Sequence, residues 1–244
     1  MTGTGAPASQ PLIKIDGLVK AYQALRPLRI AAFAVDRGDR IVLSGLDEHA
    51  AELFVYLVTG AALPDEGTVT VAGHDTRDIA TDTEWLSSLD RFGIVTHRAI
   101  LLEGMTVAAN LALPLTVAID PLADDVRARV GREASDVGLP ADRLDRPAGE
   151  LSPVERLRAH LARSVAVGPE LVMLEHPTAP LDQGEQSSAF GQTLKTLSEN
   201  RGFGWIAISE DEAFAAACGG DRRRLDAATG KIGQVKSGWK KWFS

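Results

Sequence analysis

The sequence predicts an α/β fold with a mixed, largely parallel central sheet and an insertion of helices. Short apolar runs recur between turn signals, and two of them, LVML and WIAI, are apolar throughout. Continuous apolar runs are typical of strands covered on both faces, and helix-compatible segments lie between them. The expected strands are residues 12–15, 30–35, 40–43, 68–72, 93–95, 171–174 and 205–208.

The helical insertion is expected between about residues 98 and 165. Two helix-compatible segments, DDVRARVGREASDVGL and PVERLRAHLARSVAV, lie there between Gly and Pro residues, without a convincing strand. In the second segment Leu157, Leu161 and Val165 recur at helical spacing on one face. We therefore expect one domain at residues 12–235, a flexible N-terminus at 1–11 and a tail at 236–244.

Composition and charge exclude several classes of protein. The chain has 244 residues, of which 26 are Lys or Arg and 33 are Asp or Glu, so its net charge of −7 argues against a dedicated nucleic-acid binder. The single cysteine, Cys218, cannot form an internal disulfide and suits a reducing compartment. We see no secretory signal and no apolar stretch of roughly 18 residues, so we expect a cytoplasmic protein that meets a membrane peripherally or through a partner.

Eight local signatures follow one another in the order of a known family. They are LVKAY, VDRGDRIVLSGLDEHAAEL, LPDEGTVTVAGHD, FGIVTH, MTVAANLALPL, ELSPVERLRAHLAR, ELVMLEHPTAPLD and WIAISED. Over about residues 12 to 235 the chain resembles the ATP-binding cassette (ABC) ATPase of transporters. The resemblance implies a P-loop NTPase-like fold whose helical insertion is the family's helical subdomain. It also assigns Tyr22 to the aromatic position on which the family stacks adenine.

The phosphate loop departs from the pattern of this family. A working loop, G-x-x-x-x-G-K-[ST], combines close backbone approach to phosphates with a lysine and a hydroxyl that holds Mg²⁺. In GLDEHAAE only the first glycine, Gly45, is kept, while Ala51 and Glu52 stand at the lysine and hydroxyl positions. With Asp47 and Glu48, Glu52 would oppose phosphate by about 1 kcal/mol per charge pair in water. The alternative is a solvated first helical turn that complements the helix dipole.

The catalytic positions depart as well. By the resemblance, Glu175 and His176 stand where the family has its Mg²⁺-assisting aspartate and its water-polarising glutamate. His97 replaces the Q-loop glutamine and Glu210 the switch histidine. We expect no working catalytic residue here, and favour His176 as a histidine hydrogen-bonded at a strand end over a general base. The four side chains are metal-ligand types, but without spacing of the H-E-x-x-H kind we expect no metal site.

The family signature L-S-G-G-Q, which closes over ATP held by the opposite subunit, reads LSPVE here. Ser152 can cap its helix and Pro153 suits the first helical position. Pro153 has no N–H to donate, Val154 adds bulk and Glu155 adds negative charge. The resemblance therefore implies that the chain contributes poorly to both composite ATP sites of a head-to-tail dimer.

Two further regions are candidates for docking. Asp182 stands in the dimer-facing loop of the family and NLALPL near the contact with the transmembrane subunit, although a helix N-cap and a core segment explain them equally well. The tail KSGWKKWFS carries Trp239, Lys240, Lys241 and Trp242. This basic and aromatic composition suits a membrane surface or a partner, and the alternative is a frayed chain end.

These features favour a non-hydrolysing structural or regulatory subunit of an ABC-type membrane complex. It would bind a transmembrane subunit and a homo- or heterodimeric cassette partner at the inner face of the cell membrane. No cofactor is expected at the altered cleft, whose residues would be Tyr22, Gly45, Ala51, Glu52 and Ser152. Two alternatives remain: a weak ATPase or switch that binds ATP and Mg²⁺ through Tyr22, Glu175 and His176, and a soluble cassette-derived module outside any transporter.

Overall fold

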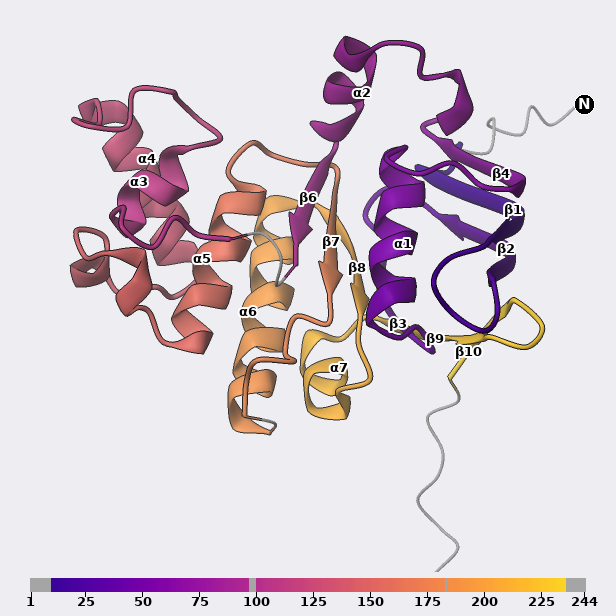
Figure 1. Ribbon diagram of the computed structural model, residues 1–244. Coiled ribbons are helices and arrows are strands. Elements are labelled where there is room, and N and C mark those ends of the chain that lie inside the picture. Colours follow the sequence, from indigo (N-terminus) through magenta and orange to yellow (C-terminus); the bar gives the residue numbers. More distant parts are fainter. Residues whose placement is uncertain (1–9, 97–99, 183, 236–244) are drawn as a thin grey trace, which may run out of the picture.

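A computed structural model describes residues 10–96, 100–182 and 184–235 and contains two sheets (Figure 1). The smaller sheet is antiparallel. Its strand order is β2 (Leu28–Val35), β1 (Ile13–Lys20), β4 (Glu66–Val71) and β5 (His74–Asp75). Along β1 and β2 buried residues alternate with exposed ones, which is typical of a sheet with one face on the core and one in solvent.

The larger sheet is parallel except for one edge strand. Its order is β10 (Lys231–Gln234), β9 (Asp221–Asp226), β3 (Arg40–Ser44), β8 (Gly204–Ile208), β7 (Leu171–Glu175) and β6 (Phe92–Val95), with β10 antiparallel to β9. The predicted α/β class and all seven predicted strands are confirmed. Three strands, β5, β9 and β10, were not predicted.

Strands β7 and β8 of the larger sheet are buried on both faces, which explains their continuous apolar runs. Trp205 and Val172 pack on one face with the helices α6 (Glu185–Arg201) and α7 (Glu212–Cys218). Ile206 and Met173 pack on the opposite face with α1 (Glu48–Thr59) and the antiparallel sheet. Since period-2 alternation sends neighbouring side chains to opposite faces, β7 and β8, which are buried at every position, need apolar residues on both faces.

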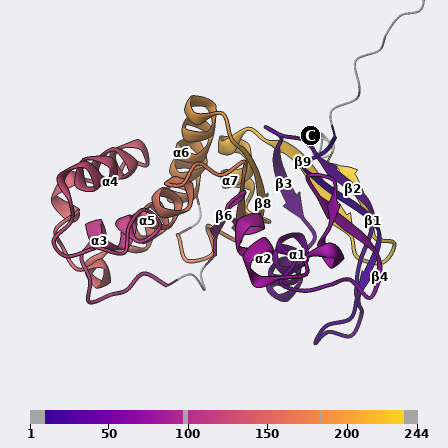
Figure 2. The ribbon, with the colours of Figure 1, turned by 90° about the horizontal axis from the view of Figure 1, so that it is seen from above.

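A group of helices extends from the far edge of the larger sheet, opposite the antiparallel sheet (Figures 1 and 2). It contains α3 (Val107–Ala112), α4 (Asp124–Asp136) and α5 (Pro153–Val165), with 3-10 turns at Ala141–Arg143 and Ala148–Glu150. A further helix, α2 (Asp82–Leu89), follows the 3-10 turn Thr76–Asp78. The predicted boundaries at 98–165, 1–11 and 12–235 stay predictions, and the predicted tail at 236–244 lies outside the described residues.

Two local expectations can be compared with the helix ends. Helix α6 has Gly184 as its N-cap, so the interpretation of Asp182 as a helix N-cap is wrong. Asn110, Leu111 and Ala112 of the NLALPL segment are buried, but Leu113 and Pro114 are exposed, so the core interpretation describes only the first half of the segment. In the part of the chain that the structure describes, no helix has both the length and the apolar character that a membrane crossing needs.

Candidate functional site

The carboxyl ends of four adjacent parallel strands meet at one edge of the larger sheet. Gly45 follows β3, and Glu210 lies two residues beyond the end of β8. Glu175 ends β7, with His176 next in the chain, and Thr96 follows β6. Because ligands of open α/β sheets bind outside the carboxyl ends of the strands, this edge is the candidate site.

Helix α1 begins inside the segment that the sequence assigns to the phosphate loop. Asp47 is the N-cap, and its Oδ1 accepts a hydrogen bond of 2.8 Å from the backbone N–H of Ala50. The N–H of Ala51 donates to the carbonyl oxygen of Asp47 over 2.9 Å. Ala51 itself is fully buried in the core between the sheets. The segment from Glu48 onward is therefore helical, and the amides of Ala50 and Ala51 are bonded within the chain.

Gly45 is held tightly against the neighbouring strand. Its φ of +90° lies in the left-handed region, and a Cβ at this position would lie 2.2 Å from the carbonyl oxygen of Leu225 in β9. Only glycine fits such a close backbone approach. The close contact with β9 thus requires glycine here whether or not phosphate binds.

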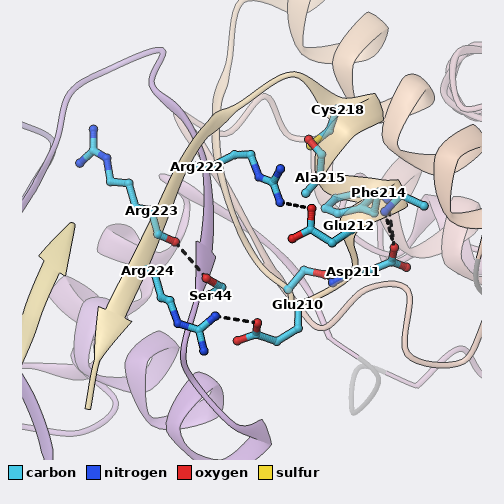
Figure 3. Close-up of polar contacts among 12 residues, drawn as sticks. Ser44, Glu210, Asp211, Glu212, Phe214, Ala215, Cys218, Arg222, Arg223 and Arg224 are labelled. Atoms are coloured by element: carbon cyan, nitrogen blue, oxygen red, sulfur yellow. Dashed lines mark hydrogen bonds and ion pairs between the residues drawn. The ribbon is translucent and has the colours of Figure 1, made fainter. Parts of the chain in front are cut away.

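The backbone amide of Gly45 is hydrogen-bonded to a carboxylate of the same chain. The backbone N–H donates to Oε1 of Glu210 over 2.6 Å. The other oxygen, Oε2, accepts from Nη1 of Arg224 over 3.3 Å (Figure 3). The sequence placed Gly45 and Glu210 in one cleft, and the structure brings them into direct contact. Arg224 was not predicted for this site.

Glu175 and His176 lie at the end of β7 beside a cavity. Glu175 is 2% exposed, and its Oε2 accepts a hydrogen bond of 3.0 Å from Oγ1 of Thr96. His176 has a φ of +39°, and its backbone N–H donates to the carbonyl oxygen of Ile208 over 2.9 Å. Its buried Nε2 has no hydrogen-bond partner among the described residues, so the expected side-chain bond is not seen at this nitrogen.

The cavity beside this pair has a volume of about 260 Å³ and also borders Arg156 and His160 of α5. Burial, reinforced by the positive charges of Arg163 and Arg156, lowers the pKa of His160 from 6.5 to about 4. His160 is therefore neutral near pH 7. The cavity brings the strand end and α5 together but offers one cationic side chain, Arg156, whose Nη1 lies 3.6 Å from Oε1 of Glu103.

Tyr22 is half-buried against the core between the two sheets. Burial, and then the negative charge of Asp47, raises the pKa of its hydroxyl. This electrostatic coupling links Tyr22 with the N-terminus of α1. The aromatic position and the altered phosphate loop therefore belong to one region.

The N-terminus of α5 is closed by its own side chains, as the sequence predicted. Ser152 and Glu155 form a capping box with Pro153 at the first helical position: the N–H of Ser152 donates to Glu155 Oε2 over 2.9 Å. Arg143 donates to the same carboxylate over 2.8 Å. Burial raises the pKa of Glu155, but hydrogen bonds from Ser152 and Arg143 outweigh it and lower the pKa overall. The carboxylate thus occupies this helix end in its charged form.

His97, the remaining predicted site residue, lies outside the described residues. Among the residues that are described, no group of three or more His, Cys, Asp and Glu side chains could hold a metal ion. Sequence reasoning did not predict two contacts, that of Glu175 with Thr96 and that of Glu210 with Arg224. No sequence pattern marks Thr96 or Arg224 as a site residue.

The comparisons with known proteins identify the family. The model of the ABC transporter family matches residues 31–179. The lipoprotein-releasing system ATP-binding protein LolD of Alcanivorax borkumensis is 32% identical over 216 residues, which cover 86% of this chain and 92% of that protein. The chain belongs to the ABC transporter ATP-binding cassette family.

Other ABC proteins are similar at lower identity. The macrolide export ATP-binding/permease protein MacB of Burkholderia cenocepacia is 26% identical over 229 residues; the match covers 91% of this chain but 32% of MacB. The dimeric cassette MJ0796, solved with bound ADP and Pi, has a TM-score of 0.73 at 20% identity, covering 92% of this chain and 99% of that one. Subunit cbiO1 of the cbiONQ transporter complex of Clostridium perfringens has a TM-score of 0.71 at 18% identity, covering 91% and 86%. These structures confirm the ABC cassette fold.

The expectation of no cofactor is wrong. Members of this family bind nucleotide: LolD and MacB are named ATP-binding proteins, and the MJ0796 cassette was solved with ADP and Pi. The expectation rested on the replaced side chains and the lost second glycine of the loop, whereas the N-terminus of α1 and the remaining backbone amides can also hold phosphate. Nucleotide is therefore the ligand to compare with the residues at the carboxyl ends of these strands.

Two backbone amides of the phosphate loop have partners within the chain. The amide of Gly45 is bonded to Glu210, and that of Ala50 to Asp47. The side chain at the lysine position, Ala51, is buried in the core. Phosphate that used the amide of Gly45 or of Ala50 would have to displace Glu210 or Asp47 from it.

Proposed function

We propose that this chain is a cassette subunit of an ABC-type membrane complex in which ATP hydrolysis is lost or strongly reduced, so that the subunit serves structure or regulation. The observation that carries the proposal is the N-terminus of α1. There the helix is capped by Asp47 and begins at Glu48, without a lysine or hydroxyl directed at the edge of the sheet. A nucleotide held there would lack the side-chain charge that usually offsets phosphate.

The strand ends support the same proposal. At the position of the water-polarising glutamate stands His176, and at that of the switch histidine stands Glu210, which is engaged with Gly45 and Arg224. Glu175 accepts a hydrogen bond from Thr96. Its side chain is one methylene longer than that of the family's aspartate. We assign none of Glu175, His176, Glu210 and His97 a catalytic role.

The signature segment extends the proposal to the partner's site. Ser152, Pro153 and Glu155 satisfy the N-terminus of α5 within the chain and place a carboxylate where the family presents backbone amides. A cassette partner would therefore receive little help with its own ATP from this chain. Because both the phosphate loop and the signature segment depart from the family pattern, we favour a role in assembly over one in catalysis.

For its partners, we propose a transmembrane subunit and a second cassette protein, by analogy with the dimeric MJ0796 cassette and with cbiO1 as part of a transporter complex. The subunit would act at the inner face of the cell membrane. Trp239, Lys240, Lys241 and Trp242 would add a membrane contact. Co-purification from gently solubilised cells tests this assignment, and a chain recovered without any transmembrane partner would favour the soluble cassette-derived module.

Release of phosphate from ATP by the purified full-length chain tests the catalytic part of the proposal. We expect a rate at least about 100-fold below that of the Alcanivorax LolD measured in parallel, because loss of a general base alone costs roughly 10²–10⁴-fold. Replacing His176 or, as a control, His74 by alanine should leave this low rate unchanged.

The opposite result would favour the alternative of a weak ATPase. A rate close to that of LolD that falls in His176→Ala but not in His74→Ala would contradict the proposal. It would assign His176 the role of the base.

A further inference from the structure

We infer that Glu210 is an autoinhibitory latch, an intrachain carboxylate that competes with nucleotide phosphate for the phosphate loop. The inference rests on the proposed function in that it takes this edge as the nucleotide cleft, but it concerns binding and not hydrolysis. Its evidence is the contact between three adjacent strand ends at Gly45, Glu210 and Arg224.

The amide on which the latch closes is fixed in position. Gly45 lies close to the backbone of β9, since an added Cβ would lie 2.2 Å from the carbonyl oxygen of Leu225. Ser44 pairs with Arg224 in the register of β3 and β9, and its Oγ donates to the carbonyl oxygen of Arg223 over 3.3 Å. The N–H of Gly45 is thus a donor held in place by β9, and the carboxylate of Glu210 accepts its hydrogen bond.

The latch itself can open. The side chains of Glu210 and Arg224 are 54% and 62% exposed, so neither is held by packing. Their ion pair is a surface pair, which contributes little to folding stability. The bond from Gly45 to the carboxylate is charge-assisted and short, at 2.6 Å. A polyanion that binds better than a single carboxylate can therefore displace Glu210 without disturbing the core.

Opening would also change the charge of the edge. While the latch is closed, the carboxylate neutralises Arg224 and repels phosphate. Once Glu210 turns away, Arg224 becomes a cation beside the phosphate loop and the carboxylate no longer occupies the amide. The latch predicts that Arg224 contacts the phosphates of the nucleotide in the open state, which supplies a positive charge that position 51 lacks.

The neighbouring pair provides a matched control. Glu212 lies two residues from Glu210 and pairs with Arg222, two residues from Arg224 (Figure 3). Arg223, between the two arginines, pairs with Asp221 and lies 5.7 Å from the centre of the Phe33 ring. Three consecutive arginines therefore have three different partners, and of the described pairs only that of Arg224 reaches Gly45.

The test measures the affinity of the full-length chain for ATP with Mg²⁺ by titration calorimetry. We expect Glu210→Ala to tighten binding by about tenfold, within the range of roughly 5- to 150-fold typical of coupled sites. Glu212→Ala should bind as the wild-type chain does. Adding Arg224→Ala to Glu210→Ala should remove most of the gain, and thermal unfolding of all variants checks that they are folded.

Two outcomes would overturn the latch. One is equal affinity of Glu210→Ala and Glu212→Ala; the other is no measurable binding by any variant. Failure of the latch is distinguishable from failure of the proposed function. ATP hydrolysis by the wild-type chain contradicts the proposed function without affecting the binding comparison, and unchanged affinities contradict the latch whatever the hydrolysis rate.

Discussion

At the scale of single residues, Asp47 and Glu210 satisfy donors that a bound anion satisfies in other phosphate loops. Asp47 accepts from the first turn of α1, and Glu210 accepts from Gly45. Carboxylates at a helix N-terminus interact favourably with the helix dipole. These two donors are therefore satisfied within the chain when no ligand is bound.

His160 is the residue whose titration should affect stability. It is 8% exposed, and its pKa falls from 6.5 to about 4 because of burial and the charges of Arg163 and Arg156. In the unfolded chain His160 becomes protonated below about pH 6.5, whereas in the folded chain it stays neutral until about pH 4. Stability should thus fall as the pH drops through this window, by roughly 3 kcal/mol for the full shift.

Urea unfolding at pH 7 and pH 5 measures this effect. The variant His160→Gln should lose less stability between the two pH values than the wild-type chain. His74→Gln, at an exposed position, should behave as the wild-type chain does. Equal losses in His160→Gln and the wild-type chain would assign the acid sensitivity to other groups.

At the scale of elements, strands that are buried on both faces could be predicted from the sequence, whereas a strand held mainly by pairing with its neighbours could not. The strands β7 and β8 are buried at every position and could be read from their apolar runs. Strand β9 has the sequence DRRRLD, in which Leu225 alone is buried. It is a strand because it pairs with β3 and β10, and pairing between distant segments leaves no local pattern.

The contact between β3 and β9 predicts a large effect of Gly45→Ala. The new Cβ would lie 2.2 Å from the Leu225 carbonyl oxygen at a φ of +90°, so both crowding and backbone strain oppose it. We expect a loss of about 3 kcal/mol in the free energy of unfolding.

Gly38→Ala is the matched control for this prediction. Gly38 has a similar φ of +85° but no atom within 4 Å of the added Cβ. It should lose only the strain, about 1 kcal/mol. Denaturant unfolding compares the two variants, and equal losses would show that the approach of β9 is not tight in solution.

At the scale of the whole molecule, the order of the strands decides which predicted residues meet. Parallel pairing of β3 with β8 brings Gly45 to Glu210 although 165 positions separate them in sequence. The resemblance to a family assigned both residues to one cleft. It could not predict their hydrogen bond, because an acid at the position of a histidine has no counterpart in the family's pattern, and Arg224 belongs to the strand that was missed.

The helical group and the sheet are joined by Arg201, at the end of α6. Its Nη1 lies 2.6 Å from Oε2 of Glu133 and its Nη2 2.5 Å from Oδ2 of Asp136, both in α4. The side chain of Glu133 is 8% exposed, so removing the arginine would leave a buried carboxylate without its counter-charge. We expect Arg201→Ala to cost about 3 kcal/mol in the free energy of unfolding.

A second substitution separates charge from packing. Because the cost arises from an unpaired buried charge, Glu133→Gln in the Arg201→Ala background should recover a large part of it, although Glu133→Gln alone should destabilise the wild-type chain. Denaturant unfolding of the four proteins gives the coupling energy directly. Additive losses would mean that Arg201 joins α4 and α6 through its aliphatic stem, and that the orientation of the helical group does not depend on this ion pair.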